Sequence, residues 1–393
     1  MKRIAASRFL ILFLLTFGPF VHAQNTEWAS LNNDARLLYQ KGQYDQAIVL
    51  VNQALDVAQK EWGNEHPNVA QTLNNLGLIY QGQGEYAQAE PLYKRSLAIW
   101  EKTLGPDSPT VAKGMNNLGE LYRVEGQYPQ AESLYKRSLA IWEKAFGPDH
   151  VDVATSLNNL ALVYKMQGKY TLAEPLYQRS LAIWEKIAGP DHPDVAISLN
   201  NLAGLYHIQG HYAKAEPLYK RSLAILEKAL GDTHPDVAKG LNNLAELYTA
   251  EGSLMLAKPL FERALAINEN AFGPDHPDVA TTLNNLGHLY YVQGNFTVAK
   301  SFFERSLAIW EKTLGPDHPH VALSLNNLAA LYQAQDQYSE AEPLFIRSLA
   351  ILENALGRKH PKVIMSLTNV ADFYRKSGRE IEATEMEKRA SVN

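Results

Sequence analysis

A three-residue pattern, Leu-Asn-Asn, recurs at a constant spacing of 42 residues, and this repeat constrains the fold more than any other feature. The pattern begins at Leu31, Leu73, Leu157, Leu199, Leu241, Leu283 and Leu325, and Met115-Asn116-Asn117 and Leu367-Thr368-Asn369 are variants in the same register. A fixed period of this length is typical of stacked repeats, in which each unit buries its apolar face against its neighbours. The sequence therefore predicts nine units without insertion or deletion.

Each unit has the pattern of two helices. In residues 67–108, apolar side chains recur every three or four residues, first from Leu73 to Tyr80 and then from Tyr86 to Trp100. This spacing places them along one face of a helix. Gly84 separates the two stretches, and Gly105-Pro106 ends the second. We therefore expect a first and a second helix in every unit.

The residues at the expected helix ends have a physical role. Glycine, or Asp336 in the eighth unit, stands where the first helix ends and a left-handed residue is favoured. Proline at the start of most first helices loses no hydrogen bond there. A single histidine precedes seven of the first helices: His66, His150, His192, His234, His276, His318 and His360. Zinc needs several ligands at one point, so we expect these residues to cap helices rather than to bind metal.

The unit resembles the tetratricopeptide repeat, in the 42-residue variant found in kinesin light chains. Residues 158–201, NNLALVYKMQGKYTLAEPLYQRSLAIWEKIAGPDHPDVAISLNN, carry this resemblance. It implies an all-α, right-handed superhelical solenoid of nine antiparallel helix pairs over residues 24–393. The expected units are about 26–66, 67–108, 109–150, 151–192, 193–234, 235–276, 277–318, 319–360 and 361–393.

The first 23 residues have the three-part layout of a secretory signal peptide. Lys2, Arg3 and Arg8 precede the apolar run 9–17, and 21–23 offers a cleavage site ending at Ala23. The alternative is an uncleaved anchor, although the run is shorter than the roughly 20 residues that a membrane span needs. We expect an exported protein, periplasmic or extracellular, without an integral membrane segment in its mature form. Kinesin light chains instead carry a coiled coil before their repeats.

Composition excludes several classes of site. The chain has no cysteine, so disulfides, iron–sulfur clusters and thiolate zinc sites are excluded. Its net charge of −5 argues against nucleic acid as the partner. No phosphate-binding loop, nucleophile elbow or metalloprotease motif occurs, and we predict no catalytic residue, cofactor or metal.

The second asparagine of the repeated pattern is the strongest candidate for a binding residue. At about 100° per residue it points opposite the core stripe of its own helix, and in tetratricopeptide repeats the first helices line a concave groove. An amide can pair with the backbone of any peptide. The expected ladder is Asn33, Asn75, Asn117, Asn159, Asn201, Asn243, Asn285, Asn327 and Asn369. The other interpretation is that asparagine caps, solvates or bridges units, which we expect for the first asparagine, as at Asn74.

Variable residues share the expected groove face with this ladder and would set specificity. The charged or titratable ones are Lys113, Glu120, Lys239, Glu246 and His288. Trp100 and its equivalents, Trp142, Trp184 and Trp310, are expected to pack in the core rather than to form a stacking platform. Glutamates such as Glu90 and Glu132 are expected to lie on solvated helix faces.

Three functions are compatible with this pattern. The favoured one is a non-catalytic scaffold that binds an extended peptide segment of a partner protein in its concave groove. The second is a structural or self-associating component of a cell-envelope complex. An enzyme is disfavoured, because an active site needs a unique constellation and nearly every polar residue here is repeated.

Overall fold

The computed structural model describes residues 26–392, which form 18 helices and no strand. The predicted signal peptide, 1–23, lies outside the described residues. The first helices of the nine units are α1 (Thr26–Gln40), α3 (Pro67–Gln83), α5 (Pro109–Val124), α7 (Val151–Met166), α9 (Pro193–Ile208), α11 (Pro235–Glu251), α13 (Pro277–Val292), α15 (Pro319–Gln333) and α17 (Pro361–Lys376).

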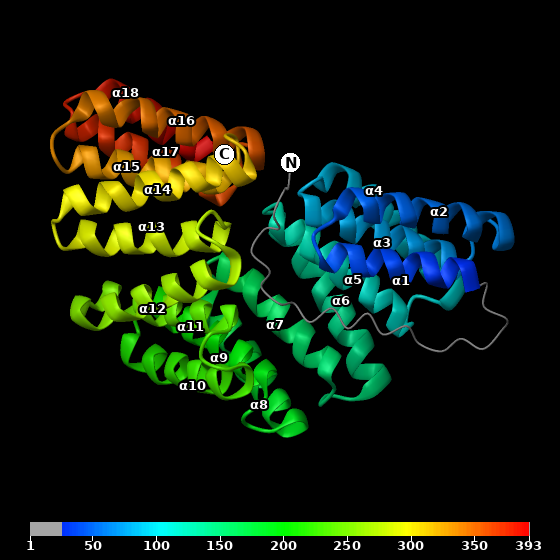
Figure 1. Ribbon diagram of the computed structural model, residues 1–393. Helices are drawn as coiled ribbons and strands as arrows, with labels where there is room; N and C mark the ends of the chain where they lie inside the picture. Colours follow the sequence, from blue (N-terminus) through cyan, green and yellow to red (C-terminus); the bar gives the residue numbers. More distant parts are fainter. Residues whose placement is uncertain (1–25, 393) are drawn as a thin grey trace. The chain divides into compact units, whose positions relative to one another are not determined.

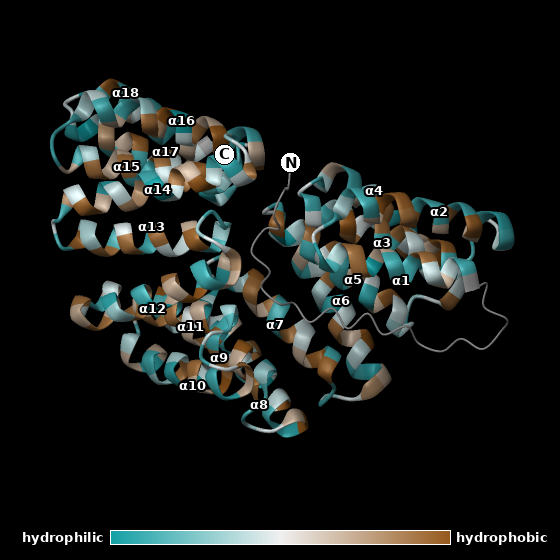
Figure 2. Ribbon diagram, viewed as in Figure 1, coloured by the Kyte–Doolittle hydropathy of each residue, from teal (hydrophilic) through white to brown (hydrophobic). Residues whose placement is uncertain are grey.

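The second helices complete the nine antiparallel pairs that the repeat predicts (Figure 1). They are α2 (Tyr44–Trp62), α4 (Tyr86–Leu104), α6 (Tyr128–Phe146), α8 (Tyr170–Ala188), α10 (Tyr212–Leu230), α12 (Leu254–Phe272), α14 (Phe296–Leu314), α16 (Tyr338–Leu356) and α18 (Glu380–Val392). The helices carry both hydrophobic and hydrophilic residues along their length (Figure 2). None of the described helices combines the length and the apolarity that crossing a membrane would need.

The chain divides between Pro190 and Asp191 into two compact parts, one containing α1–α8 and the other α9–α18. Within each part, the first helices of consecutive units contact one another as well as their own second helices. These contacts join α1 to α3, α3 to α5 and α5 to α7 in one part, and α9 to α11, α11 to α13 and α13 to α15 in the other. A first helix between two others is therefore covered on both flanks.

The helix ends form as the sequence predicts. All seven histidines that precede a first helix are N-caps, and Nδ1 of each accepts a hydrogen bond from the backbone N–H two residues later. This bond satisfies one of the free N–H groups of the first turn. Gly84 ends α3 with φ of 83°, and Asp336 adopts φ of 58° at the equivalent position. Residues 26–392 contain no group of three potential metal ligands.

Buried apolar residues of consecutive units pack together, as in the cluster that contains Val279, Trp310, Val321 and Phe345. Trp100, Trp142, Trp184 and Trp310 are buried, which confirms their predicted packing role. A serine of the second helix adds a repeated polar contact that the sequence analysis missed: Ser96 Oγ donates to the Ala70 carbonyl of the same unit at 2.7 Å. The same bond recurs from Ser180, Ser222, Ser306 and Ser348. The recurrence of serine every 42 residues was the available signal.

Candidate functional site: the first-helix face

The candidate site is the side of each first helix that points away from the core of its own unit. In α9, at about 100° per residue, Ile197, Asn201, Gly204 and Ile208 fall within about 60° of one another on this side. We call these positions, and their equivalents in the other units, the first-helix face. It carries the predicted asparagine ladder and all five of the predicted charged or titratable residues.

In at least five units, the second asparagine donates a hydrogen bond to the first asparagine of the preceding unit. Asn117 Nδ2 donates to Asn74 Oδ1 at 2.9 Å, and Asn243 Nδ2 donates to Asn200 Oδ1 at 2.7 Å. The same bond joins Asn75 to Asn32, Asn327 to Asn284 and Asn369 to Asn326. The paired asparagines therefore connect consecutive first helices.

These bonds contradict the expected free, outward orientation of the second asparagine. The prediction considered only how each first helix packs on the core of its own unit. A neighbouring first helix also covers the flank on which the second asparagine lies. Asn117 and Asn159 are buried, Asn33 is exposed, and the other six, Asn75, Asn201, Asn243, Asn285, Asn327 and Asn369, are half-buried. Of the three roles expected for the first asparagine, capping, solvation or bridging, the bonds show bridging, whereas a binding role for the second asparagine stays a prediction.

In at least two units the first asparagine also bonds forward through its NH2 group. Asn116 Nδ2 donates to Ser156 Oγ at 3.2 Å, and Asn242 Nδ2 donates to Thr282 Oγ1 at 2.9 Å. Asn74 lacks such a hydroxyl acceptor, because Gly114 stands at the position equivalent to Ser156. Asn74 is 1% exposed, and its Nδ2 has no partner among the described residues. A buried amide group without a partner is unfavourable.

Replacing Gly114 by serine is therefore expected to stabilise the protein by about 1 kcal/mol, through a bond to Asn74 and a better helix residue. The new Cβ would lie 3.1 Å from the Trp100 ring, so the ring must shift by a few tenths of an ångström. The equivalent residues of the next unit, Ser156 and Trp142, are both buried. Chemical denaturation of the wild type, G114S and G114A measures the effect, and G114S no more stable than G114A would contradict the missing bond.

The two charged residues of unit three do not form an open binding surface. Glu120 is only 7% exposed, and Arg123 donates to its two carboxylate oxygens from Nε at 2.7 Å and from Nη2 at 2.6 Å. The Tyr135 hydroxyl donates to the same carboxylate at 3.1 Å. Lys113 is half-buried, and loss of hydration lowers the pKa of its ammonium group. The expectation that Glu120 lines a groove is wrong, because internal donors already occupy its carboxylate.

Two of the three corresponding residues of units six and seven, Glu246 and His288, are more accessible than Glu120. Lys239 is half-buried, and its Nζ lies 2.9 Å from Asp236 Oδ1. Glu246 and His288 are exposed. Glu246 accepts a hydrogen bond from Asn285 Nδ2, and loss of hydration raises the pKa of its carboxyl group to about 7. Loss of hydration lowers the pKa of the His288 imidazole, which favours its neutral form.

Glutamates of the second helices connect units rather than only facing solvent. The Tyr122 hydroxyl donates to Glu90 Oε1 at 3.0 Å, and Glu132, Glu216 and Glu342 accept the same bond from Tyr164, Tyr248 and Tyr374. Lys94 Nζ lies 2.7 Å from Glu90 Oε1, as their spacing of four residues predicts. The expectation of purely solvated glutamates is therefore corrected.

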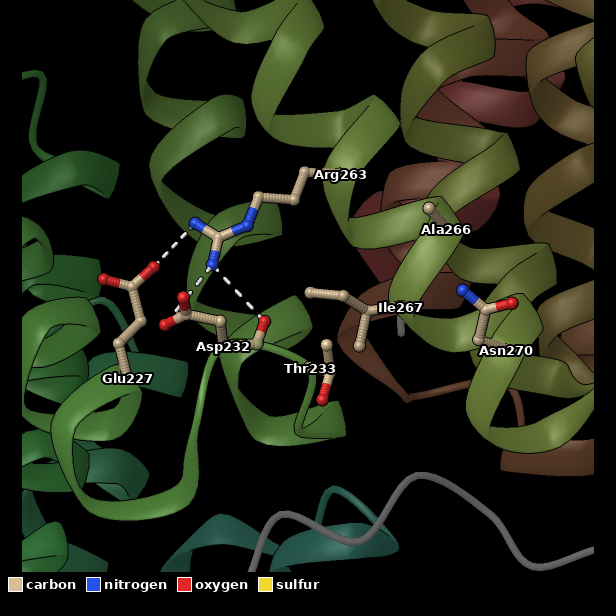
Figure 3. A pocket seen from close by; sticks show the side chains of 7 residues that line it. All are labelled: Glu227, Asp232, Thr233, Arg263, Ala266, Ile267 and Asn270. Atoms are coloured by element: carbon tan, nitrogen blue, oxygen red, sulfur yellow. Dashed lines mark hydrogen bonds and ion pairs between the residues drawn. The ribbon is translucent and has the colours of Figure 1, made fainter.

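A shallow pocket of about 460 Å³ lies between the end of α10 and the side of α12 (Figure 3). Arg263 crosses it, donating from Nη1 to Glu227 Oε1 at 2.6 Å and from Nη2 to the Asp232 carbonyl at 3.3 Å. In neighbouring units an ion pair spans the equivalent gap, as between Lys228 and Asp191. Asn270 and Thr233 replace that pair here. The pocket is thus explained by a missing ion pair, and its arginine is already engaged.

Solved structures with related folds include a Rap protein complexed with competence and sporulation factor, which is 15% identical. That match covers 93% of this chain and 97% of the Rap chain, with a TM-score of 0.62, and shows the likeness of fold alone. BtubC (BKLC) from P. vanneervenii is 24% identical over 64% of this chain and 94% of its own, with a TM-score of 0.48. A putative kinesin light chain from Podospora anserina is 27% identical over 53% of this chain and 99% of its own, with a TM-score of 0.46.

No curated protein matches the chain significantly. A model of the tetratricopeptide repeat matches residues 29–102, 72–123, 110–183, 154–228, 236–304, 278–354 and 321–391. These matches cover nearly all of the described residues, in agreement with the nine helix pairs. The chain belongs to the tetratricopeptide repeat family.

Proposed function

We propose that this protein is a non-catalytic scaffold that binds an extended segment of a partner protein on the first-helix face of residues 191–393. The observation that carries the proposal is a set of large apolar side chains left exposed on this face. Ile208 and Val292 are 56% and 45% exposed, and Leu323 and Met365 are 43% and 59% exposed. They come from α9, α13, α15 and α17, so the apolar positions recur along the stacked helices.

Recurrence along the stack suits an extended ligand better than a small molecule. First helices lie about 10 Å apart, and an extended peptide advances about 3.3 Å per residue, so every third residue would meet a new unit. Apolar side chains supply affinity in such a complex, and the variable residues between them supply selectivity. The related Rap structure, which has the same fold, is complexed with competence and sporulation factor. A protein of similar fold is therefore known in complex with another molecule, which supports the proposal.

Peptides selected from a random display library against the full-length protein test this proposal. We expect the double variant Ile208→Asp and Val292→Asp to bind the selected peptides at least about tenfold more weakly, since a contact worth about 1.4 kcal/mol changes affinity tenfold. Met255→Asp is the matched control, because Met255 is an exposed apolar residue of the second helix α12. Unchanged binding by a folded double variant would contradict the proposal that the partner binds on the first-helix face.

A second candidate function is self-association through the second helices. Met255 and Leu256 lie exposed next to each other at the start of α12, and Ile381 is exposed in α18. Exposed apolar groups of this kind favour contact with another protein surface. Light scattering over a range of concentrations separates the two functions, because a monomer at all concentrations excludes self-association.

Export is part of the proposed role. Its basis is the predicted signal peptide, with cleavage after Ala23, and the protein would act in the periplasm or outside the cell. N-terminal sequencing of the mature protein identifies the first residue and decides between cleavage and a retained anchor.

A further inference from the structure

Two units carry a glutamate at the same position of the first-helix face, and only one of them is satisfied internally. Glu120 in α5 and Glu246 in α11 are separated by three full repeats. Around Glu120, the guanidinium group of Arg123 donates to both carboxylate oxygens, and the Tyr135 hydroxyl adds a third bond. Such a two-point contact is the strongest common pairing of arginine with a carboxylate.

Unit six keeps the carboxylate and has lost both donors. Thr249 stands at the position of Arg123, and Phe261 stands at the position of Tyr135. The Thr249 hydroxyl donates to the Ala245 carbonyl at 2.8 Å, and Phe261 is buried and has no hydroxyl. Glu246 therefore retains one hydrogen bond, from the neutral amide of Asn285 in the next unit. No cationic side chain among residues 26–392 forms an ion pair with it.

The carboxylate of Glu246 is also accessible to a ligand. The residue is exposed, whereas Glu120 is buried. Protein atoms around it reduce its hydration and raise the pKa of the carboxyl group, while the Asn285 bond acts in the opposite direction. Gly204, at the equivalent position of α9, has no side chain to approach it. An opposite charge placed close to this carboxylate would favour its ionised form and lower its pKa again.

Building on the proposed function, we propose that Glu246 receives the guanidinium group of an arginine side chain of the bound partner, with Asn285 orienting the carboxylate. The internal arrangement at Glu120 is the template, because there the same carboxylate position is paired with an arginine. Arginine fits better than lysine, since its planar fork bonds both oxygens at once. The exposed apolar residues Ile208 and Val292, on the neighbouring helices α9 and α13, would contact the rest of the partner segment.

The pairing predicts a pH dependence with a definite sign. Arginine binds the ionised carboxylate, so binding is strongest above the raised pKa of Glu246 and weakens as the pH falls through about 7. Among the described titratable groups, Tyr219 of α10 is the one that the charge of Glu246 affects. Lys239 and Asp236 lie on the same helix as Glu246, and His288 stands at the equivalent position of α13. Loss of hydration, and to a lesser degree the charge of Glu246, raise the pKa of the Tyr219 hydroxyl, so Tyr219 stays neutral throughout this range.

Titration of glutamate carboxyl carbons by ¹³C NMR on the full chain tests the assignment without a known partner. The probe is N-acetyl-arginine methylamide, and the citrulline analogue at equal ionic strength is its uncharged control. We expect the arginine probe to lower the pKa of Glu246 toward the ordinary range of a glutamate, and the citrulline analogue to leave it unchanged. Glu120 serves as an internal control and should not respond to either probe.

The double variant Thr249→Arg and Phe261→Tyr restores the donors of unit three and is expected to abolish the response to the arginine probe. Equal effects of both probes on the wild type, or an unchanged response in the folded double variant, would overturn the assignment. Peptides from the display library separate this inference from the proposed function. If library peptides bind equally well after their arginine is replaced by citrulline, the arginine site is overturned, but the proposed scaffold function stands. If the arginine probe lowers the pKa of Glu246 but no library peptide binds, the arginine site is supported and the proposal of a peptide ligand is contradicted.

Discussion

Replacing Trp310 by alanine is expected to lower the free energy of unfolding by about 3–5 kcal/mol, the cost of truncating a large buried aromatic residue. Trp310 is 1% exposed and belongs to a core cluster that includes Val321, Ala322 and Leu325 of the next unit. Its ring also lies 4.9 Å from the ring of His320, centre to centre. The substitution therefore opens a cavity at the contact between two units.

The loss should be local, because each unit of a repeat array contacts only its neighbours. Hydrogen exchange is expected to show faster opening of α13–α16 than of α9–α12, together with an earlier thermal transition. Trp310→Leu is the matched control, since Leu226 and Leu352 occupy the equivalent position in other units, and it should cost less. A Trp310→Ala protein as stable as the wild type would show that this interface does not depend on the ring.

Features set by local residues were predictable from the sequence. The number of units, the helix pairs and the glycine and histidine ends all follow from a few neighbouring residues, and the structure confirms them. Even Asp336, the single substitution at the first-helix stop, adopts the left-handed conformation that its position requires. Each of these depends on interactions within one turn or one helix.

Features set by stacking were not predictable in the same way. The direction of Asn117 depends on the flank of α3, which lies one repeat away in the sequence. A helical wheel shows which side of a helix leaves its own core, but not what covers that side. Tyr122 and Glu90 illustrate the same limit, because their bond joins helices of different units. The constant repeat would have allowed such pairs to be sought, by comparing residues about one period apart.

The difference between Glu120 and Glu246 was present in the sequence but invisible without a structure. Both residues were predicted as charged positions of one groove. Only the observed bonds of Arg123 and Tyr135 show which equivalent residues to compare. Once those partners are known, Thr249 and Phe261 identify Glu246 as the carboxylate that lacks them.

Alanine at Asn243 or Asn200 is expected to destabilise the contact between units five and six by about 1–3 kcal/mol, because the remaining amide loses its partner. Asn243 Nδ2 donates to Asn200 Oδ1 at 2.7 Å, and both residues are half-buried. If the pair acts only between units, a folded Asn243→Ala protein should still bind the library peptides with nearly wild-type affinity.

The free energy of coupling between Asn200 and Asn243 shows most directly what the repeated asparagines do. It is measured by denaturation of the two single variants and the double variant. We predict a coupling of about 0.5–1.5 kcal/mol, with the double variant less destabilised than the sum of the singles. No coupling, together with a loss of peptide binding by Asn243→Ala, would contradict the bridging role of the asparagine pair. It would instead favour a role of the second asparagine in binding the partner.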